Sequence, residues 1–341
     1  MNLKNTLANA WRALEPKRKR LVTVFIFLAH LAGALSSVKA IMDTRTSQGA
    51  IAWAISLNTF PYAAVPAYWI FGRSEFQGYV TARRADVLET SGSARAYAEK
   101  LVEENLVAFP GRKEALLVEK LAKLPYTQGN EVELLVDGQA TFDSIFAGIE
   151  RATEYVLVQF YIIRDDTLGR ELKSRLAGKA KSGVRCLLLY DEIGSHSLPR
   201  RYLDELKAAG VRVAAFNSTK GSANRFQINF RNHRKIVVVD GREAWVGGLN
   251  VGDEYMGRDP KFGFWRDTHL RLAGPVVPCV QLAFVEDWHW ATEETPDLRW
   301  EVRPAPSGAS LPVLCLPSGP ADPLETCTLY FIDLISRAEK R

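Results

Sequence analysis

His233 and Lys235 stand two residues apart, and Asp240 follows five residues after Lys235, in a segment rich in valine and isoleucine. Side chains two apart in an extended chain point to the same side, so we expect His233 and Lys235 to face one cavity. The pair would place an imidazole, which can act as a nucleophile near neutral pH, beside a fixed cation. The sequence therefore predicts a catalytic centre at His233, Lys235 and Asp240.

Three further residues complete the pattern, namely Gly247, Gly248 and Asn250. Glycine has no side chain, so Gly247 and Gly248 would let backbone and substrate approach closely. The amide of Asn250 can donate a hydrogen bond to an anionic oxygen without adding charge. We expect these three positions to bind the phosphate of a substrate.

This set of residue types suits attack on a phosphodiester. Imidazole can form a covalent phosphohistidine, while Lys235 and Asn250 neutralise oxygens whose charge changes during transfer. A carboxylate would orient His233 through its other ring nitrogen. A metal-ligand role for His233 is disfavoured, because no second His, Cys or carboxylate stands at ligand spacing. An ordinary strand with a surface His and Lys is also disfavoured, because the aspartate, the glycine pair and Asn250 share the segment.

The elements that must position this segment alternate along the chain. Apolar runs predict strands at 131–138, 156–163, 184–191, 211–217, 235–240, 244–248 and 268–274. Helices are predicted at 142–152, 168–180, 201–209 and 276–291. The Asp240–Gly241 turn joins two of the strands in a hairpin. Such alternation predicts an α/β sandwich with helices on both faces of a sheet.

The N-terminal region has a different composition. Two uncharged runs, within 21–40 and 49–71, are each about long enough to cross a membrane. Basic residues precede the first run and follow the second, so the positive-inside rule predicts a hairpin with both ends in the cytoplasm. A cleaved signal peptide is the alternative for the first run. His30 and Asn58 could bridge the helices, and Pro61 and Pro66 are expected to kink the second.

Overall composition limits the remaining classes. The 341 residues are 47% hydrophobic and 24% charged, as in globular proteins, which excludes a disordered or collagen-like chain. Four cysteines without metal or disulfide spacing predict reduced thiols, and no cofactor is expected. A net charge of +5 is too small to indicate nucleic acid as a partner.

The C-terminal region repeats the start of the sandwich. LPVLCLPSG (311–319) matches the opening strand at 131–138, and ISRAE (335–339) matches IERAT (149–153). We therefore divide the chain into a membrane hairpin (1–73), a helical connector (74–128), a first sandwich domain (129–300), and a linker with the truncated start of a second repeat (301–341). The alternative is a C-terminal helix packed on the first domain.

The stretch 229–277 resembles the phospholipase D superfamily motif, and specifically the bacterial cardiolipin synthases. Supporting motifs are IFGR (70–73), VQFYIIRDD (158–166), LLLYDEIGS (187–195) and LPSGP (316–320). The resemblance implies a multi-pass inner-membrane phosphatidyltransferase that joins two phosphatidylglycerols into cardiolipin and glycerol without a metal, its catalytic domain cytoplasmic.

Carried over residue by residue, the resemblance gives each candidate a role. His233 matches the motif histidine, and Lys235 and Asn250 match phosphate-binding positions. Asp240 matches the motif aspartate, a structural support rather than a proton carrier. Asp267, followed by Glu254, is the candidate carboxylate that holds His233.

The sequence departs from the family in one respect. Of its five histidines, only His233 has a lysine two residues later, whereas the family carries two such motifs at one active site. We expect either a longer protein whose C-terminal half holds the second motif, or a homodimer in which each chain supplies one His233. A phospholipase D-type phosphodiesterase that uses water and an inactive truncated fragment are the alternative functions.

Overall fold

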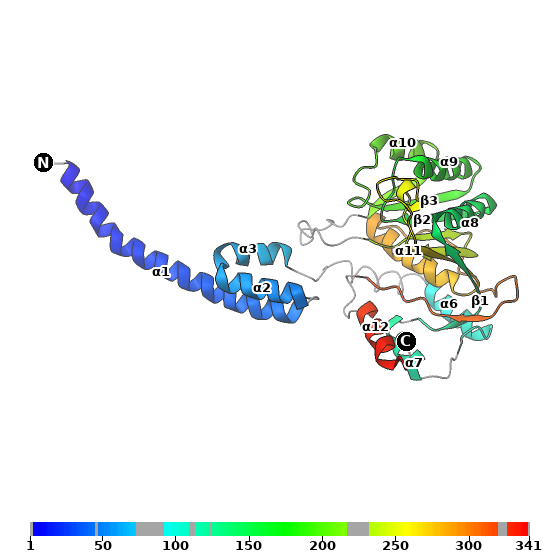
Figure 1. Ribbon diagram of the computed structural model, residues 1–341, viewed down its shortest axis with the longest axis horizontal. Coiled ribbons are helices and arrows are strands. Elements are labelled where there is room, and N and C mark those ends of the chain that lie inside the picture. Colours follow the sequence, from blue (N-terminus) through cyan, green and yellow to red (C-terminus); the bar gives the residue numbers. More distant parts are fainter. Residues whose placement is uncertain are drawn as a thin grey trace. The chain divides into compact units, whose positions relative to one another are not determined.

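The computed structural model describes residues 3–44, 47–72, 92–108, 113–122, 124–216, 232–319 and 326–339. Within these ranges the chain forms two units (Figure 1). The first contains helices α1 (Leu3–Asp43), α2 (Ser47–Thr59) and α3 (Pro61–Phe71). The second contains the elements from α6 (Gly92–Glu103) onward, including the segment that carries His233.

In the first unit, the predicted span 21–40 lies inside α1, whose 27 residues Lys17–Asp43 are long and apolar enough to cross a membrane. The predicted second span, 49–71, differs from expectation because it is divided at Phe60 into α2 and α3, of 13 and 11 residues. Each is shorter than the roughly 20 residues that a spanning helix needs. Pro61 begins α3, where a residue without an amide hydrogen is tolerated. The two-span hairpin is therefore not what the described residues show.

Polar contacts join α1 to α3. His30 Nε2 lies 3.3 Å from the hydroxyl of Tyr62, and Trp69 Nε1 donates to Ser36 Oγ at 3.1 Å. The predicted bridging role of His30 therefore has a contact to support it. Asn58 instead donates to a carbonyl four residues earlier in its own helix, at 2.7 Å. That bond satisfies its amide within α2 and leaves the bridging to other side chains.

A mixed sheet forms the centre of the second unit, with the strand order β4-β3-β2-β5-β6-β7-β1-β8. The strands are β1 (Thr127–Val136), β2 (Tyr155–Phe160), β3 (Arg185–Asp191), β4 (Arg212–Phe216), β5 (Ile236–Val239), β6 (Glu243–Gly247), β7 (Thr268–Ala273) and β8 (Leu311–Val313). β2, β3 and β4 run parallel, and the other neighbouring pairs are antiparallel. The predicted α/β class and the order of its elements are confirmed.

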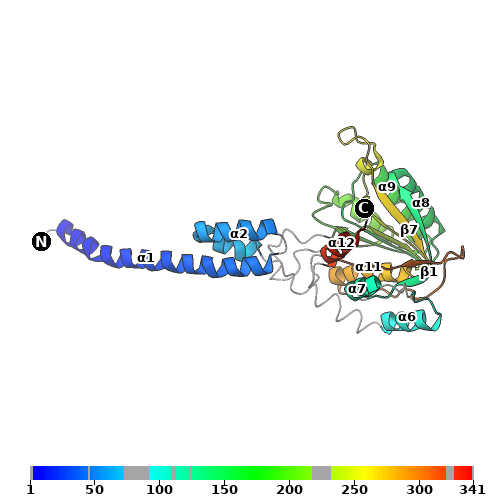
Figure 2. The ribbon, with the colours of Figure 1, turned by 60° about the horizontal axis from the view of Figure 1, so that its bottom comes forward.

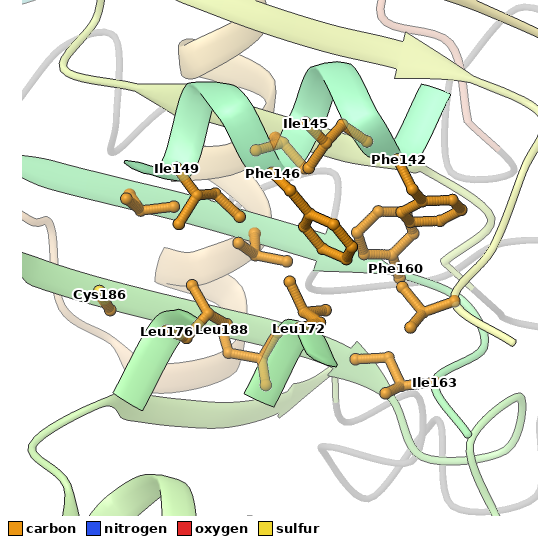
Figure 3. Packing of buried hydrophobic residues seen from close by; sticks show 14 of the residues in the cluster. Phe142, Ile145, Phe146, Ile149, Phe160, Ile163, Leu172, Leu176, Cys186 and Leu188 are labelled. Atoms are coloured by element: carbon orange, nitrogen blue, oxygen red, sulfur yellow. The ribbon is translucent and has the colours of Figure 1, made fainter. Parts of the chain in front are cut away.

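Helices cover both faces of this sheet, as expected (Figures 1 and 2). α8 (Asp137–Arg151), α9 (Thr167–Lys181) and α10 (Arg200–Ala208) lie on one face, and α11 (Val277–Thr292) contacts β4, β5 and β6. Apolar residues of α8 recur at helical spacing, so one stripe of this helix packs on the sheet. Figure 3 shows Phe142, Phe146 and Ile149 of α8 packed together with Leu172 and Leu176 of α9.

The chain leaves β1 earlier than predicted. The strand ends at Val136, and Gly138 lies in the first turn of α8. A Cβ at Gly138 would approach the carbonyl oxygen of Tyr255 to 2.4 Å, so the glycine permits close packing of α8 on the 3-10 helix Asp253–Met256.

The C-terminal elements attach to the same unit. β8, predicted to open a second repeat, pairs with β1 as an edge strand of the existing sheet. α12 (Thr326–Arg337) contacts α7 (Lys113–Ala122) of the connector. Neither element forms a separate second domain within the described residues, and the truncated repeat stays a prediction.

Candidate active site

Five strand ends meet at one edge of the sheet and hold the candidate residues. β2 and β3 end there, and the register pairs Gln159 of β2 with Ile236 at the start of β5. Ile236 also pairs with Val246 of β6, and Gly247 pairs with His269 of β7. Segments that are far apart in the sequence are therefore brought to one place by the strand order.

The segment 232–235, which we call the HxK segment after His233 and Lys235, leads into β5 with its side chains pointing alternately to two sides. Asn232 and Arg234 turn inward, where Asn232 Nδ2 and Arg234 Nη1 donate to Asp287 Oδ2 of α11 at 2.7 and 2.6 Å. Asp287 is 0% exposed. The backbone amide of Asn232 donates to Asp191 Oδ2, at the end of β3, at 3.0 Å. Because alternate residues face opposite sides, these anchors direct His233 away from α11.

His233 lies on the ring of Tyr161, the residue directly after β2. The two ring centroids are 4.0 Å apart with an angle of 18° between the planes. Lys235 Nζ lies 5.5 Å from the centroid of the same tyrosine and donates to the carbonyl oxygen of His233 at 2.6 Å. The imidazole and the ammonium group thus share one aromatic support, as the two-residue spacing predicts.

The ammonium group of Lys235 is partly desolvated. Burial lowers its pKa to about 8, and the carboxylates of Asp267 and Asp191 partly oppose that change. A lysine with this pKa still carries its charge at pH 7. Because Lys235 is poorly hydrated, a phosphate oxygen would meet a strong electrostatic partner there.

Gly247 and Gly248 serve the packing of the neighbouring strand. A Cβ at Gly247 would lie 2.4 Å from Nδ1 of His269, and a Cβ at Gly248 would lie 2.2 Å from Oδ1 of Asp267. These approaches explain why glycine is needed at both positions. Their close neighbours in the structure are His269 and Asp267, and a role of the two glycines in phosphate binding stays a prediction.

Asn250 is held from both sides of its amide. Oδ1 accepts a hydrogen bond from the backbone amide of Ile162 at 3.1 Å, and Nδ2 donates to the hydroxyl of Tyr255 at 3.1 Å. The side chain is buried, with 6% of the residue exposed. An asparagine amide carries two N–H donors. A role for the second donor in phosphate binding stays a prediction.

Asp267, the first candidate for orienting His233, directly precedes β7. Its carboxylate accepts from the backbone amide of Thr268 at 2.7 Å and from Trp265 Nε1 at 3.3 Å. Its charge also raises the pKa of both Lys235 and His269. Asp267 therefore lies in the site, where its charge favours the protonated form of Lys235. Its predicted role in orienting His233 stays a prediction.

Glu254, the second candidate for that role, binds a guanidinium group. Arg164 Nε donates to Glu254 Oε1 at 2.9 Å, and Arg164 Nη1 donates to Ser197 Oγ at 3.1 Å. Sequence reasoning quoted the motif that contains Arg164 and assigned this residue no role. The signal available in the sequence was the acidic residue Glu254, four positions after Asn250.

Asp240 lies at the opposite end of β5 from Lys235. Its carboxylate accepts from the backbone amides of Thr153, Glu154 and Tyr155 and from the Thr153 hydroxyl, at 2.8–2.9 Å. Burial raises the pKa of Asp240, but these hydrogen bonds outweigh burial and lower it below the ordinary value. These contacts support the structural role that the resemblance implies for Asp240, because its carboxylate binds the backbone at the start of β2.

His269 is a second imidazole at the site that sequence reasoning did not single out. It is 1% exposed, and Nδ1 has no hydrogen-bond partner within the described residues. Burial lowers its pKa to about 4, so the ring is neutral at pH 7. Its place two residues after Asp267 in an extended strand was the available signal.

A pocket of about 390 Å³ lies beside the HxK segment. His233, Lys235 and Ser318 give it polar walls, whereas α11, β7 and residues 313–317 supply mainly apolar ones. The pocket can therefore bind a molecule that carries a polar group next to an apolar part. Within the described residues, no group of three His, Cys, Asp or Glu side chains is arranged to hold a metal ion.

Comparison with known proteins identifies the family. A family model described as the phospholipase D-like domain of cardiolipin synthase matches residues 145–260. A cardiolipin synthase A from Pseudomonas fluorescens (strain SBW25) is 48% identical over 326 residues, which cover 94% of this chain and 67% of that protein. The chain belongs to the cardiolipin synthase family. The resemblance predicted from 229–277 is confirmed.

Other relatives of the family match over a similar extent. A cardiolipin synthase A from Pseudomonas putida (strain W619) is 48% identical over 319 residues, which cover 92% of this chain and 66% of that protein. The chain therefore spans about two thirds of the length of the curated relatives it matches.

Two solved structures are similar at low sequence identity. NucT from Helicobacter pylori matches 48% of this chain and 98% of its own, with 16% identity and a TM-score of 0.38. Nuc from Salmonella typhimurium, a phospholipase D family member, matches 48% of this chain and 96% of its own, with 12% identity and a TM-score of 0.35.

Proposed function

We propose that this chain supplies the nucleophilic half of a phosphatidyltransferase site, which converts two phosphatidylglycerols into cardiolipin and glycerol. One observation carries the proposal: His233 and Lys235 are presented together at one end of the sheet, beside Asp267, in a member of the cardiolipin synthase family. The partly desolvated ammonium group and the adjacent imidazole match the needs of phosphoryl transfer.

The reaction then runs in two displacements at one phosphorus. A ring nitrogen of His233 attacks the phosphodiester and forms an N–P bond, and the bond from phosphorus to the glycerol headgroup breaks. The departing glycerol oxygen takes a proton from an acid. In the second step the hydroxyl of another phosphatidylglycerol attacks phosphorus and gives up its proton, and His233 is released. Lys235 balances the charge of the phosphate oxygens in both steps.

The acid must come from a second ionisable group. His269 is another imidazole at this end of the sheet, but it is buried and its pKa is lowered to about 4, so it is unprotonated at neutral pH. General acid catalysis contributes about 10²–10⁴ in rate. We therefore assign the acid to a second HxK motif, carried either by a further part of a longer protein or by a second copy of the chain.

Membrane attachment follows from the same proposal. Phosphatidylglycerol resides in the bilayer, and α1 supplies one apolar helix of spanning length. A location in the bacterial inner membrane agrees with the basic residues that precede the apolar part of α1 (Lys17, Arg18, Lys19 and Arg20). Basic residues also follow the second apolar run, and a cytoplasmic sheet-containing unit requires residues 47–72 to return the chain to that side. Phospholipids and the membrane are then the partners, and nucleic acid is not.

Product analysis tests the proposal. The chain is reconstituted in phosphatidylglycerol vesicles and its products are separated by chromatography, with His233→Ala as the variant and His289→Ala, on the last turn of α11, as the control. We expect cardiolipin and glycerol in equal amounts, lost in His233→Ala and kept in His289→Ala. Phosphatidic acid as the product would establish the hydrolase instead. No product would exclude catalysis by a homodimer of this chain.

A further inference from the structure

A loop of aromatic and basic residues, Gly257–Arg266, projects beside the candidate site. It links the 3-10 helix to β7, and in Figure 2 it is the yellow loop that extends beyond the strand ends. Phe262 is 51% exposed and Phe264 is 78% exposed. Large aromatic side chains exposed together on one loop indicate a contact surface. We infer that this loop, the aromatic loop, inserts into the interface of an anionic lipid bilayer.

The loop is built to hold its phenylalanines outward. Phe262 and Gly263 donate their backbone amides to the carbonyl of Asp259, at 3.2 and 2.9 Å, which closes a tight turn. Gly257 and Gly263 have φ of 67° and 66°, a left-handed conformation in which a side chain is strained. The backbone that carries the exposed rings is thus held by this turn, so binding requires little additional ordering of the backbone.

The inward residue of the loop fastens it to the site. Trp265 lies against Tyr255, with ring centroids 5.0 Å apart at 71°, and its Nε1 donates to Asp267. Tyr255 in turn accepts from Asn250. A bilayer that receives Phe264 is therefore coupled, through Trp265, to Asp267 and Tyr255 of the candidate site.

The charge on the loop selects the partner. The loop carries three basic side chains, Arg258, Lys261 and Arg266, and one acidic side chain, Asp259. Arg258 and Arg266 also form ion pairs outside the loop, with Asp253 at 3.3 Å and Asp137 at 3.4 Å. Lys261 Nζ lies 5.5 Å above the ring of Phe262, so cation and aromatic ring are presented side by side. Aromatic rings at headgroup depth flanked by lysine and arginine are the pattern of interfacial anchors, and each basic residue near an anionic surface contributes about 1 kcal/mol.

A surface that binds a protein partner would be expected to have a different amino-acid composition. Protein interfaces are depleted of lysine at their centre, whereas Lys261 here lies over the ring of Phe262. The inference rests on the proposed function in one respect, since a lipid substrate is what brings this site to a bilayer. Its test must therefore work without turnover.

Spin labelling provides such a test. The full chain carries a nitroxide at Phe264→Cys, or at Ser182→Cys as the control, in a Cys315→Ser/Cys327→Ser background; Cys186 and Cys279 are buried. Ser182 is exposed at the end of α9, before β3 begins, and so lies at the opposite end of the sheet from the site. Each protein is reconstituted in vesicles of phosphatidylglycerol or of phosphatidylcholine alone, and accessibility to oxygen and to a nickel chelate is measured.

We expect the label at 264, in phosphatidylglycerol vesicles, to be several-fold more accessible to oxygen and several-fold less accessible to nickel than the label at 182. The preference should weaken in phosphatidylcholine vesicles. Nickel accessibility equal to that at 182 would overturn the inference and leave the loop in water. Low accessibility to both reagents would overturn it in favour of a protein contact. Product analysis judges the catalytic proposal separately.

Discussion

Substituting Asp287 by asparagine tests whether the buried anchor positions the HxK segment. Asp287 Oδ2 accepts from Gln159, Asn232 and Arg234 at 2.6–2.7 Å, with the side chain 0% exposed. Asparagine keeps the volume and one acceptor oxygen but removes the charge opposite Arg234. Breaking one side of a buried ion pair costs about 3–5 kcal/mol, because the other charge stays buried without its partner.

The matched control is Asp204→Asn, an exposed carboxylate on α10. Surface substitutions of this kind change stability by about 0.5 kcal/mol or less. Thermal unfolding of the detergent-solubilised chain should show Asp287→Asn melting on the order of 10 °C lower, and Asp204→Asn melting with the wild type. Below the transition, amide exchange at 232–235 should speed up in Asp287→Asn alone. Equal melting temperatures for the two variants would refute the reasoning.

Three further predictions concern the strands around the site. Affinity for phosphatidylglycerol headgroups should fall as pH rises through about 8, where Lys235 loses its proton, and Lys235→Arg should abolish that fall in a binding titration. The pKa of His269 is lowered to about 4, so between pH 6.5 and 4 the unfolded chain binds more protons than the folded chain. The free energy of unfolding should therefore fall as the pH is lowered from 6.5 to 4. His269→Gln should flatten this part of a pH series of urea unfolding curves. Gly248→Ala should reduce activity at least tenfold by displacing Asp267, whereas Gly178→Ala, which meets nothing within 4 Å in α9, should stabilise the chain by up to about 1 kcal/mol in the same unfolding assay.

The local pattern of apolar and polar residues was sufficient to predict most strands of the sheet. Apolar runs with helical stretches between them predicted β2, β3, β5, β6 and β7 to within three residues at each end. The HxK spacing also predicted that His233 and Lys235 lie together, because two-residue periodicity is a property of the strand itself. The boundary at Gly138 was missed, because its place in α8 is set by a distant carbonyl, that of Tyr255.

The rest of the site depends on strand order. Asp191, Asp287 and His269 come from three different elements and meet the HxK segment only after the sheet has formed. Nothing in the spacing of a sequence reports that a buried aspartate on α11 lies under Asn232. The division of the second apolar run at Phe60 was also not predicted. Pro61 indicated a kink, but the hydropathy of the run is that of one continuous span.

The outermost strand limits how other chains can attach to this sheet. Leu311 and Val313 of β8 pair with residues of β1. The backbone nitrogen of Pro312, between them, therefore points away from β1, to the unpaired side of the strand. Proline has no hydrogen to donate there, and a ladder cannot continue past it. The sheet is thereby protected from strand addition and from aggregation along this border. Any additional lobe that packs here must do so through side chains and leave the sheet at its present width.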